Sequence, residues 1–266
     1  MREVNRRPIG VFDSGIGGLT VVGELRRCLP QEDIIYLGDT ARVPYGNKSE
    51  DTIKKFAIQD TEFLIKFRVK VIVVACNTVS SVALEFLKDR NLGIPIFGVV
   101  EPGVKVAINK SRSRKVGVIG TVATINSGAH KRLFPEDFEV IEKACPLFVP
   151  LAEEGINSGS IAKDVAELYL AHLREKVDTV ILGCTHYPIL KDVIRDVLGS
   201  EISLVDPAEE VAKEVRDFLL KGGLLNSGGG NLDIYLTDIP PHYLELIERF
   251  LGDRVNNLKK VDLENH

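Results

Sequence analysis

Two apolar segments that each end in a cysteine constrain the fold of this chain more than any other feature. The first covers residues 71–75, which are uncharged and rich in β-branched side chains, and it leads into Cys76–Thr78. The second covers residues 179–183 and leads into Cys184–His186. Runs of this kind predict strands that are buried on both faces of a parallel sheet. Ligands of open parallel sheets bind beyond the carboxyl ends of the strands, so we expect chemistry at both cysteines.

The two halves of the chain repeat one plan. Residues 115–121 resemble residues 9–14, and Cys184 follows Cys76 by 108 positions. Landmarks that keep their order and near-constant spacing predict a duplicated unit, with one thiol on each side of a shared cleft. Two further pairs belong to the same series: Pro44–Gly46 with Glu153–Gly155, and Gly98–Pro102 with Ser203–Pro207.

Strand-like and helix-like segments alternate along the chain, which predicts parallel, doubly wound sheets. In the first half we expect strands at 8–12, 33–37, 71–75 and 94–100, a loop at 40–48, a helix capped by Ser49, and a helix from Cys76 through Leu87. After Pro207 we expect a helix to about residue 221, a flexible Gly/Ser/Asn loop at 222–231, a strand at 232–237 and a final helix at 240–251.

The predicted fold class is α/β, with two pseudo-symmetric, doubly wound (flavodoxin-like) parallel-sheet domains that face a central cleft. The repeat has no third copy, so we expect the C-terminal segment to return and complete the first unit. The predicted first domain is therefore 1–98 plus 207–266 and carries Cys76, whereas the second domain is 99–206 and carries Cys184.

Composition excludes several classes of protein. The 266-residue chain is 44% hydrophobic and 27% charged, as is typical of a soluble globular protein. Its net charge of −4 gives no electrostatic footprint for nucleic acid, and no apolar run reaches the roughly 20 residues of a membrane helix. The charged residues 1–7 do not resemble a signal peptide, so the four cysteines indicate reduced thiols in the cytoplasm. We expect a cytoplasmic protein that binds neither nucleic acid nor membrane.

Cysteine suits proton transfer because its reference pKa of about 8.5 lies nearer neutrality than that of any hydroxyl. A helix N-terminus or a polar partner favours the thiolate further. A single buried cysteine after a strand is usually a small core residue. The duplicated position, with a polar tripeptide in each copy, favours a functional role for Cys76 and Cys184 instead. Cys28 and Cys145 lack such neighbours, and we interpret them as packing residues.

Asp13 and Ser14 precede a Gly-rich turn that leads into a helix, a layout like that of phosphate-binding loops. Neither the dinucleotide spacing nor the Walker lysine is present, however. One interpretation is a tight strand-to-helix turn. The other makes Asp13 a general base or thiol partner and Ser14 a donor to a ligand.

His186 is most simply a proton-transfer residue beside Cys184, although an isolated loop histidine is more often a hydrogen-bonded surface group. Cys184, His186 and Cys76 together could suggest zinc, but no paired Cys-x-x-Cys spacing supports a metal site. Glu153 either faces the cleft opposite Tyr45 or is a solvated surface glutamate.

Four motifs resemble those of the glutamate racemases, in the cofactor-independent aspartate/glutamate racemase family. They lie at Asp13–Leu19, Gly38–Gly46, Ala75–Thr78 and Gly183–Pro188, and the segment Asp-Thr-Ala-Arg-Val-Pro-Tyr-Gly is especially specific. The resemblance runs from about residue 8 to residue 221. One departure is His130, where the family usually has tyrosine, and it affects only nearby pocket or packing contacts.

The resemblance implies that Cys76 and Cys184 are two acid/base thiols that act on opposite faces of glutamate, with no cofactor and no metal. Inversion through a planar carbanion requires proton removal on one face and delivery on the other, which suits two facing thiols. By the same resemblance, Asp13, Glu153 and His186 set thiol protonation. The substrate would be held by Asp13, Ser14, Tyr45, Gly46, Asn77, Thr78, Thr121, Thr185 and His186.

The resemblance also implies a bacterial enzyme whose D-glutamate feeds peptidoglycan synthesis. We expect a homodimer, whose arrangement the sequence does not specify. Two alternatives stay open. Racemisation of aspartate or a related acid is disfavoured by the match at residues 38–46. A non-catalytic metal- or nucleotide-binding protein would use the same thiols as ligands.

Overall fold

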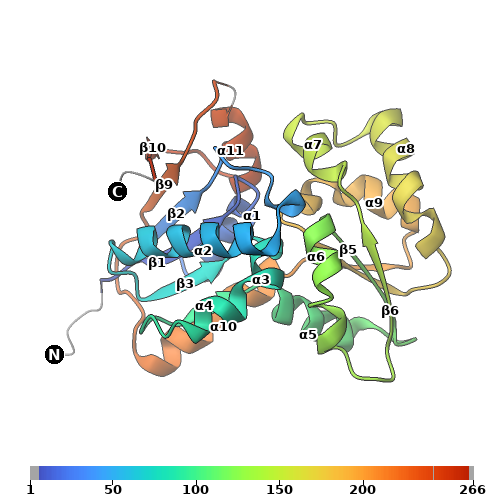
Figure 1. Cartoon of the computed structure of the whole chain (residues 1–266), viewed down its shortest axis with the longest axis horizontal. Coiled ribbons are helices and arrows are strands. Elements are labelled where there is room, and N and C mark those ends of the chain that lie inside the picture. The colour runs from blue at the N-terminus through green and yellow to red at the C-terminus, as the bar shows by residue number, and fades with distance from the viewer. Residues whose placement is uncertain (1–5, 242, 264–266) are drawn as a thin grey trace.

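Two parallel β-sheets, one of six strands and one of four, form the centres of two lobes (Figure 1). The computed structural model describes residues 6–241 and 243–263. The first lobe consists of the six-stranded sheet and the helices around it, and the second lobe consists of the four-stranded sheet and its helices. In the described part of the chain no helix combines the length and hydropathy needed to cross a membrane.

The first sheet has the strand order β10-β9-β2-β1-β3-β4, with every neighbouring pair parallel. Its central strands are completely buried, as expected for uncharged runs. The strands are β1 (Ile9–Asp13), β2 (Ile34–Gly38), β3 (Val71–Val74), β4 (Ile96–Gly98), β9 (Leu232–Leu236) and β10 (Leu258–Lys260). The helices are α1 (Leu19–Cys28), α2 (Glu50–Ile65), α3 (Asn77–Val82), α4 (Leu84–Asp89), α10 (Ala208–Gly222) and α11 (Tyr243–Leu251).

The second sheet has the order β6-β5-β7-β8 and is also entirely parallel. Its strands are β5 (Lys115–Gly120), β6 (Glu139–Ala144), β7 (Thr179–Gly183) and β8 (Ser203–Val205). Its helices are α5 (Val100–Lys110), α6 (Val122–Ser127), α7 (Phe148–Glu153), α8 (Gly159–Leu170) and α9 (Lys191–Leu198). Short 3₁₀ helices lie at Tyr45–Asn47, Lys131–Leu133, Ala171–Leu173 and Tyr187–Leu190.

The strand order confirms the predicted fold class. The series β2-β1-β3-β4 in the first lobe has the same arrangement as β6-β5-β7-β8 in the second. In both lobes the strand order reverses beside the first strand, β1 or β5. The cysteine follows the neighbouring strand, β3 or β7. Ligand sites of doubly wound sheets lie at this switch point, so the duplication brings two equivalent sites into one molecule.

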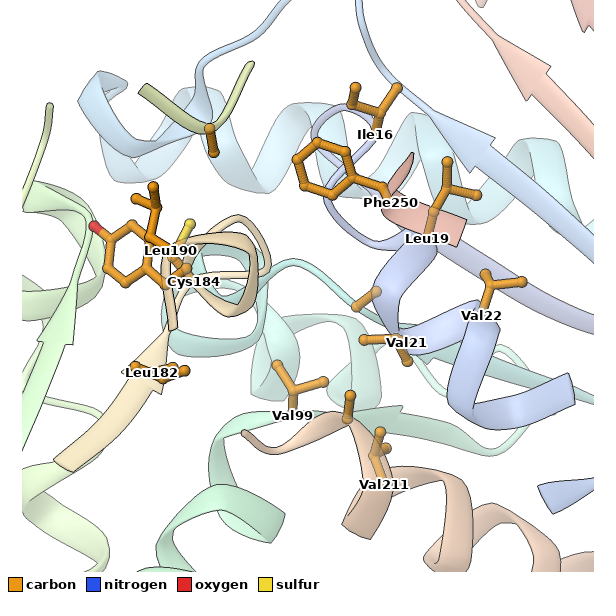
Figure 2. Close-up of a cluster of buried hydrophobic side chains, with 14 of the residues drawn as sticks. Ile16, Leu19, Val21, Val22, Val99, Leu182, Cys184, Leu190, Val211 and Phe250 are labelled. Carbon is orange, nitrogen blue, oxygen red and sulfur yellow. The ribbon is translucent and has the colours of Figure 1, made fainter. Parts of the chain in front are cut away.

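The chain passes between the sheets twice, once between β4 and α5 and once between β8 and α10. The C-terminal strand β9 pairs with β2, so this segment belongs to the first sheet. We therefore propose the domain boundaries 1–98 plus 207–266 for the first lobe and 99–206 for the second. A single buried cluster spans both lobes. Figure 2 shows Leu182, Cys184 and Leu190 on one side of it and Ile16, Leu19 and Phe250 on the other.

Two local expectations were wrong. The strand predicted at 94–100 contains only Ile96–Gly98, and Val100 already begins α5. The backbone N–H of Val99 donates to the hydroxyl of Ser80 at 3.3 Å instead of joining the sheet. The helix predicted from Cys76 through Leu87 is divided into α3 and α4 at Ala83, whose φ of −124° is not helical. By contrast, the predicted cap is confirmed, because Ser49 accepts the Thr52 N–H at 3.4 Å.

A buried ion pair lies at the amino ends of the strands of the first sheet, opposite the end that carries Cys76. Lys70 and Glu32 precede β3 and β2, and their side chains are paired and almost fully buried. Lys70 Nζ also donates to the carbonyl of Leu224 at 2.8 Å, and the Asn226 N–H donates to Glu32 at 2.8 Å. Burial lowers the pKa of Lys70 although Glu32 opposes the shift. The pair therefore fastens the Gly/Ser/Asn loop to the amino ends of the strands.

Lys70→Met should lower the free energy of unfolding by about 3–5 kcal/mol, because it leaves the Glu32 carboxylate buried without its counter-charge. Chemical denaturation measures the change. Lys105→Met is the matched control, since its pair with Glu214 at 2.8 Å lies at the surface and should contribute less than about 1 kcal/mol. The double variant Glu32→Gln with Lys70→Met should recover part of the loss. Equal costs for the Lys70 and Lys105 variants would contradict this account.

Candidate active site

The carboxyl ends of four strands converge on one small cavity between the lobes. Ser14 follows β1, Cys76 follows β3, Thr121 follows β5 and Cys184 follows β7. The cavity measures about 20 Å³, which is room for about one water molecule. Every predicted site residue except Asp13 and Glu153 lines it: Ser14, Tyr45, Gly46, Cys76, Asn77, Thr78, Thr121, Cys184, Thr185 and His186.

The cavity continues into a pocket of about 180 Å³, which Glu153 lines. Pro44, Gly46 and Thr121 line both spaces. The inner cavity is too small for an amino acid, so a substrate must displace the segment around Pro44 or separate the lobes. Val43, Pro44 and Val149 also line the inner cavity. Neither valine was predicted as a site residue, because apolar residues of this kind carry no chemical signal, although Val43 lies within the motif Gly38–Gly46.

Cys76 lies in the first lobe at the N-terminal end of α3, and only 4% of its surface is exposed. Its thiol donates to the Ser14 hydroxyl at 3.5 Å. Burial, reinforced by the nearby Asp13 carboxylate, raises the pKa of Cys76 to about 12, although Ser14 and backbone N–H groups oppose the shift. The thiol is therefore protonated at neutral pH.

Asp13 is completely buried behind the cavity. Burial raises its pKa, although the positive charge of His186 and backbone N–H groups of the following turn oppose this effect. The hydroxyl of Thr185 donates to Asp13 Oδ1 at 3.5 Å. Because Asp13 belongs to the first lobe and Thr185 to the second, this hydrogen bond joins the two lobes beside both cysteines.

Cys184 has a different partner from that of Cys76. Its sulfur lies 3.9 Å from His186 Nδ1, and His186 Nε2 lies 3.0 Å from Glu153 Oε1. Burial alone would lower the pKa of His186, but the contacts with Cys184 and Glu153 outweigh it and raise the pKa to about 10. The imidazole is therefore positively charged at neutral pH. This cation lies directly beside the Cys184 sulfur.

Two threonines join the lobes on the other side of the cavity. The hydroxyls of Thr78 and Thr121 lie 3.0 Å apart, and Thr121 also caps α6 by accepting the Thr124 N–H at 3.2 Å. Gly46 packs directly on Thr121, because a Cβ at Gly46 would lie 2.6 Å from the Thr121 Cβ. Glycine is therefore required where the loop closes over the cavity.

Asn77 offers an unused hydrogen-bond acceptor. Its side chain is 98% buried and lines the cavity, and its Oδ1 has no hydrogen-bond partner within the described residues. Leaving a buried polar atom unpaired is costly, so such atoms usually have a partner in the working state. A ligand that carries an ammonium group would supply that partner.

The hydroxyl of Tyr45 forms its contacts with other side chains of the protein. It donates to Asp39 and lies 3.1 Å from Asp60 Oδ2, while Arg42 pairs with both carboxylates. Burial and the neighbouring Asp39 raise the pKa of Asp60 well above its usual range. Tyr45 therefore lines the cavity while its hydroxyl anchors the loop. Sequence reasoning missed Asp60, although a carboxylate on the apolar face of α2, between Ala57 and Leu64, was the available signal.

His130, the departure from the family pattern, lies outside the cavity. It is fully buried, and neither ring nitrogen has a hydrogen-bond partner in the described ranges. Burial lowers the pKa of His130 to about 4, so the ring is neutral. Within residues 6–241 and 243–263, no three His, Cys, Asp or Glu side chains are grouped as metal ligands would be.

Comparison with known proteins identifies the family of this chain. The model of the Asp/Glu/Hydantoin racemase family matches residues 18–215. The chain belongs to this family. As a racemase it is an isomerase, and the family resemblance predicted from the four motifs is confirmed.

Individual relatives match over nearly the whole chain. The glutamate racemase of Geobacter metallireducens is 49% identical over 265 residues, which cover 97% of each chain. The crystal structure of glutamate racemase from Francisella tularensis in complex with D-glutamate has a TM-score of 0.93 and 43% identity, covering 99% of this chain and 100% of that one. The structure of glutamate racemase from Thermus thermophilus in complex with β-chloro-D-alanine has a TM-score of 0.89 and 48% identity. The match covers 98% of this chain and 99% of that one.

Glu153→Gln should lower the pKa of His186, because the amide lacks the negative charge that stabilises the imidazolium. NMR titration of the ring measures the pKa directly. Since the folded-state pKa lies above the ordinary value of 6.5, the stability that protonation contributes is complete below pH 6.5 and is lost as the pH rises through about 10. The variant should therefore flatten the pH dependence of stability across this range. Glu154→Gln, at the exposed neighbouring position, should change neither quantity.

Proposed function

We propose that this racemase interconverts L-glutamate and D-glutamate by using Cys76 and Cys184 as its two acid/base groups. The observation that carries the proposal is the pair of thiols at equivalent strand ends of two lobes, lining one cavity. A stereocentre inverts when one group removes the Cα proton from one face and another group delivers a proton to the opposite face. Both groups come from the chain, so the reaction needs neither a cofactor nor a metal.

The different partners of the two thiols suit one direction of the reaction. The positive His186 favours a thiolate on Cys184, which takes the Cα proton of L-glutamate, while the Cα–H electron pair passes into the carboxylate as an enediolate. The protonated thiol of Cys76 then gives its proton to the other face, which yields D-glutamate and a Cys76 thiolate. In the reverse direction Cys76, beside Asp13, removes the proton and Cys184 supplies one. His186 and Glu153 hold the positive charge that stabilises the Cys184 thiolate.

Substrate binding uses the polar groups that surround the thiols. Asn77 Oδ1 accepts a hydrogen bond from the α-ammonium group. The hydroxyls of Ser14, Thr78, Thr121 and Thr185 donate to the two carboxylates. Backbone N–H groups at the strand ends stabilise the charge that develops on the α-carboxylate. Tyr45 and Gly46 close the cavity over the side chain. The relatives that match nearly the whole chain at 43–49% identity include glutamate racemases, one of them in complex with D-glutamate, and this supports the choice of substrate.

The cellular role follows from the product. We propose that D-glutamate from this enzyme supplies peptidoglycan and hence cell-wall synthesis in the bacterial cytoplasm, and that the enzyme works as a homodimer. Glutamate is the only partner that the reaction itself requires.

Cys76→Ala and Cys184→Ala should each abolish racemisation, because each thiol serves one face of the substrate. Circular dichroism of L- or D-glutamate follows turnover, and the protein's own spectrum checks the fold. Cys28→Ala, which removes a thiol far from the cavity, is the matched control and should stay active. In deuterated water the wild-type enzyme should place deuterium at Cα of early product while unreacted substrate stays protiated. Early product that retains the original Cα proton would refute the two-thiol mechanism.

Glutamate should be preferred over aspartate by at least about 100-fold in kcat/KM, because a site built from hydrogen-bond donors discriminates strongly when a partner is missing. The side-chain carboxylate of aspartate lies one methylene closer to Cα and leaves donors in the loop near Gly46 and Thr121 unpaired. Initial rates with both amino acids measure the ratio. Equal efficiency would instead favour racemisation of aspartate or of both acids.

A further inference from the structure

The Gly-rich turn between β1 and α1 lies against the catalytic imidazole of the other lobe. A Cβ added at Gly17 would lie 2.4 Å from Thr185 Oγ1, 2.5 Å from His186 Nδ1 and 2.7 Å from His186 Cε1. Real Cβ contacts essentially never fall below 3.0 Å. Gly17 is buried, and it is not among the glycines with positive φ. The sign of φ therefore does not require glycine at position 17, and the three atoms nearest to an added Cβ all belong to second-lobe side chains.

His186 has little freedom to move away from such a side chain. Its Nδ1 faces the Cys184 sulfur at 3.9 Å and its Nε2 faces Glu153 at 3.0 Å. The ring of Phe250 lies edge-on to the imidazole at 5.2 Å. A movement of the imidazole away from residue 17 therefore changes its distance to Cys184 or to Glu153, the two contacts that keep it charged.

The hydroxyl of Thr20 links the backbone of the same turn to the backbone of the second lobe. The Thr20 hydroxyl donates to the carbonyl of Gly17 at 2.9 Å and lies 3.5 Å from the carbonyl of Thr185. Gly17 thus occupies the point where the first lobe meets the strand end that carries Cys184. Its hydrogen atom, in place of a side chain, permits this close approach.

We propose that Gly17 is a positioning residue, whose missing side chain lets the first lobe seat His186 between Cys184 and Glu153 when the lobes close. The proposal rests on the proposed racemase function for its kinetic consequence, but not for its structural one. A methyl group at position 17 must displace the His186 Nδ1 by at least ~0.5 Å to restore a 3.0 Å contact. The thiolate of Cys184 then loses the cation that stabilises it, while Cys76 keeps its own surroundings.

Gly17→Ala should reduce kcat for racemisation by about 10- to 100-fold, as small displacements of catalytic groups do. KM should change less than kcat, because the added methyl group displaces only the Thr185 hydroxyl among the substrate-binding hydroxyls, while those of Ser14, Thr78 and Thr121 stay in place. NMR titration of His186 should show a lower pKa than in the wild-type enzyme, a change that simple loss of stability would not produce. Gly15→Ala is the matched control from the same turn, because its Cβ would meet only Val43 Cγ2 at 3.6 Å. It should resemble wild type in kcat and in the His186 pKa.

A second experiment keeps the proposal testable even if Gly17→Ala weakens the fold. The double variant Thr185→Ala with His186→Ala removes all three atoms that a Cβ at residue 17 would meet. In that background, adding Gly17→Ala should shift Tm much less than it does in the wild-type chain. An equal shift in both backgrounds, or an unchanged kcat and His186 pKa in the single variant, would overturn the proposal. Absence of glutamate turnover in the wild-type and Gly15→Ala enzymes would refute the proposed function instead, and the NMR and Tm results would still decide the role of Gly17.

Discussion

Burial of two thiols between facing sheet edges is the constraint on which the site depends. A low-dielectric cleft opposes thiolate formation, as the raised pKa of Cys76 shows. The two thiols have different neighbours. Cys76 is kept protonated beside a serine hydroxyl and a buried carboxylate. Cys184 lies next to an imidazolium that Glu153 holds in its charged form. The two thiols thus have different electrostatic surroundings, although the backbones of the two lobes follow the same plan.

The lobes are joined by short hydrogen bonds, and glycines allow them to approach closely. Thr78 meets Thr121, and Asp13 meets Thr185, each pair joining one lobe to the other. Gly17 and Gly46 permit approaches that a Cβ would prevent. These contacts hold the lobes close together, and the cavity between them holds no more than about one water molecule. Entry of an amino acid therefore requires movement of the segment around Pro44 or separation of the lobes.

In the first sheet, the stabilising ion pair and the thiol lie at opposite ends of the strands. The buried pair of Lys70 and Glu32 lies at the amino ends of the strands, where it fastens the loop that follows α10. The cysteines lie at the carboxyl ends. At the same carboxyl ends, the hydroxyl of Tyr45 joins the cavity loop to Asp39 and Asp60, and Thr237 donates to Asp39 from just beyond β9 at 2.9 Å. The C-terminal segment therefore supports the loop that covers the site, and none of its described residues lines the cavity itself.

The sequence by itself determined the fold class, the racemase family and the strand ends that carry the thiols, because uncharged β-branched runs and repeated motifs are local properties of the chain. It could not tell that Val99 and Val100 leave the sheet, since a short apolar run suits a strand and a buried helix start equally. Nor could it pair Asp60 with Tyr45, or Gly17 with His186. Only the tertiary structure decided those contacts and the charge states of Cys76 and His186. A pKa and a steric limit depend on which distant groups share a buried space, and folding alone brings those groups together.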